Sequence, residues 1–237
     1  MTPEHDALRL LSGGEVALVG LMPHSSNYTF LAEVRHPDCT VLGVYKPRKG
    51  ERPLWDFPEG TLYRREVAAF ELSRALGWPA VPPTVVRDGP HGPGSMQLFV
   101  ESDPNEHFFT LRDARLDDFA GVALFDAIAN NADRKSGHCL VDDDGIIWSV
   151  DHGVCFAVAP KLRSVIWEFA GERIPAELLE DVRRVAGALR TGAVRETMTA
   201  LLDRAEVDAA ADRAEDLVRA KRFPEPDSER PFPWPPV

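Results

Sequence analysis

The sequence has few cysteines and no long hydrophobic run, and each shortage excludes a class of protein. Cys39, Cys139 and Cys155 are the only cysteines in 237 residues, and none belongs to a CxxC pair. A disulfide framework is therefore not expected, and a reducing compartment is. No stretch approaches the roughly 20 apolar residues of a membrane span, and the N-terminal segment lacks the basic and apolar regions of a secretion signal. We expect a cytoplasmic protein with no stable membrane insertion.

Positive charge is the next shortage. The chain has 27 Lys and Arg residues against 38 Asp and Glu residues, which gives a formal net charge of -11. Clustered basic residues are needed to neutralise a nucleic-acid backbone, so no nucleic-acid partner is expected. A chain of this length forms either one large domain or two small lobes, and both can bury a core.

The first part of the chain shows short runs with the period of β-strands. Turn-forming residues separate these runs, which is typical of a small antiparallel sheet. A helical pattern with Thr61 as its N-cap and Gly77 as its stop lies between the third run and a second β pair. The predicted strands cover residues 15–22, 27–35, 40–46, 84–87 and 95–101, and the predicted helix covers residues 62–76. Together they predict an N-lobe over residues 1–101.

The second part of the chain has a mainly helical pattern. Asp126 is the only charged residue between Phe119 and Ala129, as expected of a helix that is buried nearly all round. The runs CLV and IIWSV then flank DDDG, whose Asp-Gly pair indicates a β-hairpin. Further helices are predicted over residues 175–190, 194–202 and 206–221. These elements predict a helical C-lobe over residues 102–223.

The last segment, residues 224–237, is rich in proline. Its six prolines deny it the hydrogen bonds of a helix or a sheet and favour extended backbone. We expect a tail that lies along its own domain or is disordered, or that binds the aromatic groove of a protein partner.

Acidic residues lie on either side of the predicted hairpin. Asp133 stands in the loop NNADRKSGHC, His138 follows five positions later, and Asp151 begins the tripeptide DHG after the hairpin. Phosphoryl transfer requires one Asp that orients the acceptor hydroxyl and a second Asp that holds metal on the phosphates. Protein kinases provide them as DxxxxN followed by DFG, and this chain has DRKSGH followed by DHG.

A phosphate-binding cation and its counter-ion are also predicted. Strand alternation places Lys46 on one face with Leu42 and Val44, so Lys46 is expected on the apolar side of the sheet. Glu66 lies four residues from both Leu62 and Phe70, and it therefore shares their inward-facing stripe. A buried ammonium and a buried carboxylate are costly alone and tolerable together, which predicts that Lys46 and Glu66 are paired.

The connection between the first two strands, MPHSSNY, has no glycine and so no GxGxxG motif. Ser25, Ser26 and Asn27 in this turn carry backbone and side-chain donors suited to phosphate oxygens. We expect them to contact the phosphates of a nucleotide.

These motifs, in the order KP, REVAAF, MQLFVE, NNADRKSGH and VDHG, resemble a small bacterial family of phosphatidylinositol 3- and 4-kinase-like proteins. They are more distantly similar to atypical kinases whose catalytic loop reads DRH. The resemblance covers residues 14–190, and the loop with its DHG is the specific part of it. It implies an α+β, two-lobed, protein-kinase-like fold with a small antiparallel-sheet N-lobe, a helical C-lobe, and ATP in the cleft between them.

The resemblance also implies a role for each matching residue. His138 stands where the family pattern has Asn, and because imidazole is a softer ligand than an amide oxygen, Mn2+ is expected to bind there as well as Mg2+. The implied roles are Lys46 on the phosphates, Glu66 as its ion-pair partner, Asp133 as catalytic Asp, Arg134 and Lys135 as charge-stabilising residues, His138 and Asp151 as metal ligands, and Gln97, Leu98, Phe99 and Val100 as the adenine-contacting hinge.

The sequence therefore predicts an ATP-dependent phosphotransferase that uses Mg2+ or Mn2+ and an unidentified hydroxyl-bearing substrate. Two alternatives keep the same fold: a nucleotide-binding scaffold without activity, and an enzyme that transfers AMP. A third alternative is a zinc site, for which the ligands would be His138, Cys139, His152 and Cys155. Neighbouring strand residues point to opposite faces, which disfavours this zinc site.

Overall fold

The structure is a computed structural model that describes residues 3–23, 27–227 and 230–237. The chain divides into two compact units. Unit 1 consists of Met1–Phe70 and Pro82–Val100, and unit 2 consists of Glu71–Val81 and Glu101–Val237. The division after Val100 lies one residue before the expected boundary, but residues 71–81 group with the second unit, which the sequence-based boundaries did not anticipate.

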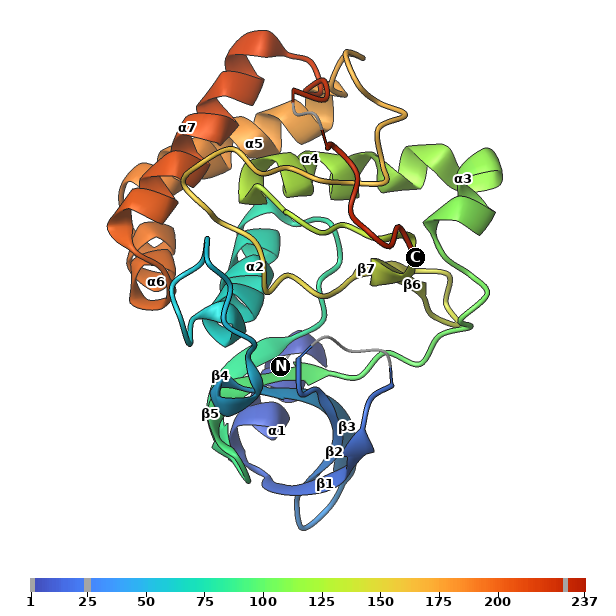
Figure 1. Ribbon diagram of the computed structural model, residues 1–237, viewed down its shortest axis with the longest axis vertical. Helices are drawn as coiled ribbons and strands as arrows, with labels where there is room; N and C mark the ends of the chain where they lie inside the picture. The colour runs from blue at the N-terminus through green and yellow to red at the C-terminus, as the bar shows by residue number, and fades with distance from the viewer. Residues whose placement is uncertain (1–2, 24–26, 228–229) are drawn as a thin grey trace. The chain divides into compact units, whose positions relative to one another are not determined.

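Unit 1 is built on a five-stranded antiparallel sheet in the order β1-β2-β3-β5-β4. Its strands curve around a short helix (Figure 1). The last strand starts earlier and ends earlier than predicted, because the turn after Gly89 is short and Phe99 and Val100 have already left the ladder. The strands are β1 (Glu15–Leu21), β2 (Phe30–Arg35), β3 (Thr40–Pro47), β4 (Thr84–Gly89) and β5 (Gly92–Leu98).

One face of this sheet is covered by α1 (Pro3–Gly13), a helix that the sequence pattern did not predict. Leu11 of α1 is fully buried and packs in one cluster with Val34 and Tyr45 of the sheet. The register places Lys46 on the opposite face, beside Val44 and Leu42, of which Leu42 is largely exposed. The alternation was therefore predicted correctly, but the expectation that Lys46 shares the core face was wrong.

The helix α2 (Leu62–Leu76) has the bounds predicted for it. It ends because Gly77 adopts a left-handed φ of 92°, which allows its N–H to bond back to the Ser73 carbonyl at 2.7 Å. Thr61 holds the predicted N-cap position, and its carbonyl accepts the Arg65 amide at 3.3 Å. Its hydroxyl donates to the Pro58 carbonyl, and the Tyr63 amide is held by the Glu51 carboxylate at 2.9 Å.

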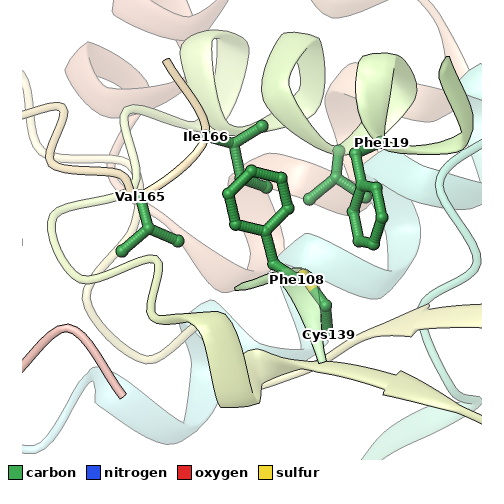
Figure 2. Packing of buried hydrophobic residues seen from close by; sticks show 6 residues of the cluster. Phe108, Phe119, Cys139, Val165 and Ile166 are labelled. Carbon is green, nitrogen blue, oxygen red and sulfur yellow. The ribbon is translucent and has the colours of Figure 1, made fainter. Parts of the chain in front are cut away.

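Unit 2 is helical. Its helix α4 is buried along most of its length, as predicted, and α5 packs along α7 (Figure 1). A second buried cluster gathers Phe108, Phe119, Cys139, Val165 and Ile166, with the two phenylalanine rings edge to face (Figure 2). The helices are α3 (Phe108–Arg115), α4 (Ala120–Ala129), α5 (Ala176–Arg190), α6 (Ala193–Leu201) and α7 (Arg204–Ala220).

The hairpin and the tail complete unit 2. The predicted hairpin is present as β6 (Cys139–Val141) and β7 (Ile147–Ser149). The tail lies along its own unit, because the Pro231 carbonyl accepts hydrogen bonds from the Ser164 amide at 2.9 Å and from the Trp167 indole at 3.1 Å. None of the helices in the described ranges is long and apolar enough to cross a bilayer.

We predict that Leu11→Ala destabilises unit 1 by about 2–5 kcal/mol, because it leaves a cavity between α1 and the sheet. The matched control is Arg9→Ala on the exposed side of the same helix, which should change stability by less than about 0.5 kcal/mol. Urea unfolding of both variants measures the difference. Equal effects would show that α1 is not packed on the sheet.

Candidate active site

A fully buried ion pair lies beneath the loop that the sequence singles out. Arg134 donates to both carboxylate oxygens of Asp126 on α4, from Nε at 2.8 Å and from Nη2 at 2.9 Å, and both side chains are 0% exposed. Burial alone would lower the pKa of the Arg134 guanidinium, but the charge and hydrogen bonds of Asp126 more than compensate and raise it. Arg134 is therefore a permanent cation inside unit 2.

The same guanidinium joins the loop to the segment that carries Asp151. Its Nη1 donates to the carbonyl oxygens of His138 and Val150, each at 3.1 Å, and its Nη2 lies 2.8 Å from Nε2 of His152. These contacts contradict the expected role of Arg134 on the transferred phosphoryl group, because a side chain with no exposed surface cannot contact a substrate. Arg134 is a positioning residue.

His138 and Asp151 are brought together by this arrangement. Their side chains approach to 3.3 Å between Nε2 and Oδ2, and the Asp151 side chain is 52% exposed. Asp151 also has a left-handed φ of 61°, which is uncommon for a residue with a side chain and occurs often at functional sites. The structure thus brings together the two residues predicted as metal ligands, and metal binding by them stays a prediction.

Asp133 and Lys135 form a second, partly buried pair in the loop. Their carboxylate and ammonium groups lie 3.2 Å apart, and the Asp133 amide donates to the Asn131 side chain at 3.0 Å. Burial raises the pKa of the Asp133 carboxyl, and although Lys135 opposes this shift, the charge of Asp151 adds to it. A carboxylate with a raised pKa is a better proton acceptor than an exposed one.

In unit 1, the ammonium of Lys46 on β3 forms an ion pair with the carboxylate of Glu66 on α2. Glu66 is buried and the Lys46 side chain is 19% exposed. The pairing predicted from the two stripes is therefore present, and it links the sheet to the helix.

The turn between the first two strands was also predicted to contact the nucleotide phosphates. Ser25 and Ser26 lie outside the described residues. The side-chain oxygen of Asn27 accepts the Arg52 amide at 2.8 Å, so it is already engaged within unit 1.

The predicted hinge residues, 97–100, make different hydrogen bonds within unit 1. Gln97 is buried and donates to the Thr84 hydroxyl, whereas the Phe99 amide bonds to the Leu42 carbonyl at 3.0 Å. The chain passes from unit 1 to unit 2 directly after Val100, as a hinge requires. Adenine contact by residues 97–100 stays a prediction.

The alternative zinc site gains no support. Among the residues that the structure describes, no group of three His, Cys, Asp or Glu side chains is arranged to hold a metal. Cys139 and Cys155 are buried, and burial raises the pKa of the Cys139 thiol to about 12. Cys139 packs in the apolar cluster with Phe108 and Phe119, as a small core residue does.

Sequence reasoning missed two contributors to this site, Asp126 and His152. Asp126 is the single charge in an apolar helix, and that isolation was a signal of a buried partner. His152 is fully buried beside Arg134, lies 3.1 Å from the Ser149 hydroxyl and packs edge-on against Phe125. It thus provides hydrogen bonds and ring packing at the position where kinases have the Phe of DFG.

The tail also contacts the candidate loop. The Ser136 amide, inside the loop, donates to the Pro236 carbonyl at 2.9 Å. Because this contact joins residues that are far apart in the sequence, no local pattern predicted it.

An antiparallel sheet unit with a Lys–Glu pair and a helical unit with two converging acidic segments define a protein-kinase-like fold. A crystal structure of the Golgi casein kinase has the same fold, with a TM-score of 0.55 over 92% of this chain and 76% of that chain at 14% sequence identity. The family model for phosphatidylinositol 3- and 4-kinases matches residues 85–204. The chain belongs to this phosphatidylinositol 3- and 4-kinase family, and the predicted fold class is confirmed.

Two relatives show how far the similarity extends. Protein Rv2133c of Mycobacterium tuberculosis is 39% identical over 99% of this chain and 97% of its own length. Phosphatidylinositol 4-kinase gamma 4 of Oryza sativa subsp. japonica is 34% identical over 116 residues, which are 41% of this chain and 20% of the rice protein. The bacterial relative is thus similar throughout, and the plant kinase over one segment.

We predict that Arg134→Ala destabilises unit 2 by about 3–5 kcal/mol, because it leaves the Asp126 carboxylate buried without its partner. Arg134→Lys should restore little, since an ammonium cannot make the two-pronged bond. Lys135→Ala, which breaks the partly exposed pair next to it, should cost less than about 1 kcal/mol. Chemical unfolding measures the free energy of unfolding of the three variants. A small loss of stability for Arg134→Ala would contradict its role as a positioning residue.

Stability should also depend on pH through Asp133. Its pKa is higher folded than unfolded, so ionisation of Asp133 opposes folding, and that cost grows as pH rises through the two values. Asp133→Asn cannot ionise and should gain stability relative to the wild type between about pH 3 and about pH 7. Urea midpoints across this range test the sign, and a difference that stays constant or shrinks would refute the raised pKa.

Proposed function

We propose that this chain is an ATP-dependent phosphotransferase that moves the γ-phosphoryl group of ATP to a hydroxyl acceptor. Family and fold support kinase chemistry in general. The observation that carries the finer proposal is that Asp133, His138 and Asp151 lie close together. The buried Arg134 holds the backbone at His138 and at Val150, the residue before Asp151.

Asp133 is the proposed catalytic residue. As the acceptor oxygen bonds to the γ-phosphorus, the bond from that phosphorus to the oxygen bridging to the β-phosphate breaks, and ADP leaves. The acceptor proton passes to the Asp133 carboxylate, whose raised pKa suits it to receive one. Lys135, 3.2 Å from Asp133, provides the positive charge that the sequence-based prediction shared between it and Arg134.

The donor set next to Asp133 fits a divalent cation. His138 and Asp151 would hold Mg2+ or Mn2+, which when bound supplies positive charge to the phosphate oxygens. Arg134 holds the backbone of both ligand segments, so the spacing of the two side chains does not depend on the exposed loop surface.

Unit 1 is proposed to bind the nucleotide. Lys46, oriented by Glu66, would contact the phosphates. Lys46 lies on a sheet face that also presents Val19, 56% exposed, and Leu42, 41% exposed, an apolar surface suited to a purine ring. Residues 97–100 would add backbone contacts to the ring.

The acceptor is proposed to be a molecule with a free hydroxyl group. A net charge of -11 disfavours an anionic membrane surface as its location, because such leaflets attract basic proteins. AMP transfer is the alternative reaction on this fold, and the position of the label in radioactive ATP distinguishes the two. Label from the γ-phosphate is expected on the acceptor, and label from the α-phosphate is not.

We predict that Asp133→Asn and Asp151→Asn fail differently. Asp133→Asn should lose phosphoryl transfer by about a hundredfold or more yet keep metal-dependent ATP binding, since it removes only the proton acceptor. Asp151→Asn should lose that binding. Thermal unfolding reports it, because ligand at about 100 times its dissociation constant adds about 2.7 kcal/mol.

The matched control is Asp143→Asn. Asp143 is an exposed carboxylate in the turn between β6 and β7, and this variant should behave as wild type. Wild-type turnover in both active-site variants would rule out the assignment. No thermal shift of the wild type with ATP, with or without Mg2+ or Mn2+, would contradict nucleotide binding and with it the phosphotransferase proposal.

A further inference from the structure

A pocket of about 360 Å³ in unit 1 is not used by the proposed function. Its walls come from residues 48–62, between β3 and the start of α2, and from His91 and Pro93 at the β4–β5 turn. The volume is within the range of pockets that hold small molecules. The Phe30 ring at the start of β2 lies 5.0 Å from the His91 ring, so the pocket belongs to the end of the sheet where Lys46 also lies.

Three cations line this pocket in a strongly acidic protein. Arg48, Lys49 and Arg52 are all exposed. Arg48 lies over Gly60, whose left-handed φ of 72° and missing side chain permit the approach, because a Cβ there would collide with the guanidinium. Grouped guanidinium and ammonium groups of this kind favour phosphate or carboxylate ligands.

Glu51 supplies an acceptor in the same pocket. One of its carboxylate oxygens accepts the Tyr63 amide at 2.9 Å, and the other is buried without a hydrogen-bond partner among the described residues. A buried unpaired acceptor is unfavourable. Glu51 is half-buried and lines the pocket, so a small rotation of its carboxylate toward the cavity would let a ligand hydroxyl donate to this oxygen. The second acid of the pocket, Glu59, is exposed and repels anions less.

An apolar wall stands next to these polar groups. Phe57 is 7% exposed and Leu62 is 6% exposed. The Arg65 guanidinium lies 4.9 Å from the centre of the Phe57 ring, which fixes one wall of the pocket. The carbon skeleton of a ligand can pack on this wall while its charged end faces Arg48, Lys49 and Arg52.

We propose that this pocket binds a small phosphorylated molecule that also carries a hydroxyl group. The phosphate contacts Arg48, Lys49 and Arg52, and the hydroxyl donates to the unpaired oxygen of Glu51. The inference concerns a second site and does not rest on the phosphotransferase proposal.

Occupancy of the pocket acts on the ion pair of unit 1. Lys46 lies two residues before Arg48, and Glu66 lies one turn of α2 after Leu62. A ligand that joins residues 48–52 to the first turn of α2 therefore links the two segments that carry Lys46 and Glu66. Binding should protect the start of α2 from opening.

The test uses ribose 5-phosphate and inorganic phosphate on the full chain, with a chelator present to exclude divalent metal. Titration calorimetry should show tighter binding of ribose 5-phosphate, and amide hydrogen exchange should slow in peptides covering residues 48–66. The variant carrying both Arg48→Gln and Arg52→Gln should bind at least about tenfold more weakly. Arg9→Gln, an exposed cation of unit 1 outside the pocket, should bind within about twofold of wild type.

Two further variants distinguish this pocket from the nucleotide site proposed around Lys46. Lys46→Met should retain ribose 5-phosphate binding and weaken it by no more than about threefold, because Lys46 does not line the pocket and acts on it only through the coupled ion pair. Glu51→Gln should lose the preference for ribose 5-phosphate over inorganic phosphate. The proposal is overturned if the double arginine variant binds as wild type, if Lys46→Met alone abolishes binding, or if neither probe binds or protects residues 48–66.

Discussion

The candidate active site depends on one buried contact, the pairing of Arg134 with Asp126. A guanidinium without exposed surface needs an anion and needs acceptors for its remaining N–H groups, and the fold supplies both. Asp126 comes from α4, the backbone acceptors come from the residues at His138 and Val150, and His152 closes the set. Since these partners come from separate segments of the chain, satisfying one cation fixes the positions of all of them.

Different residues of the site provide its rigidity and its reactive groups. Asp133, Lys135 and Asp151 keep exposed surface and so remain available to ligands, while the residue between Asp133 and Lys135 is fully buried. Successive residues of an extended loop face opposite ways, so Asp133 and Lys135 share one side while Arg134 between them faces the interior. A substitution at Arg134 would disturb catalysis through geometry, with no contact to substrate.

Unit 1 also contains an ion pair, Lys46 with Glu66, which is less buried than the pair in unit 2. Lys46 and Glu66 are charged groups on a sheet face and on a helix, and each reduces the cost of the other. The helix start is fixed separately, by the Glu51 carboxylate on the Tyr63 amide. The ion pair and the helix cap therefore constrain α2 at two neighbouring turns.

The sequence predicted what depends on local period and on motif order. The strands, the bounds of α2, the hairpin and the three C-terminal helices follow from apolar spacing, turn residues and glycine, and the structure has them. It did not predict α1, because PEHDALRLLSG is a short segment whose helical state is stabilised by packing of Leu11 on the sheet. The role of Arg134 was also mispredicted, since a motif match gives the position of a residue in the chain and carries no information on its burial.

The distribution of cysteine over the two units has a practical consequence. Cys39 of unit 1 is exposed, whereas Cys139 and Cys155 of unit 2 are buried. A thiol-reactive reagent would label Cys39 in the native protein and would reach the other two only when unit 2 opens. The ratio of slow to fast labelling in one sample would then measure how often the helical unit opens, with the exposed thiol as internal reference.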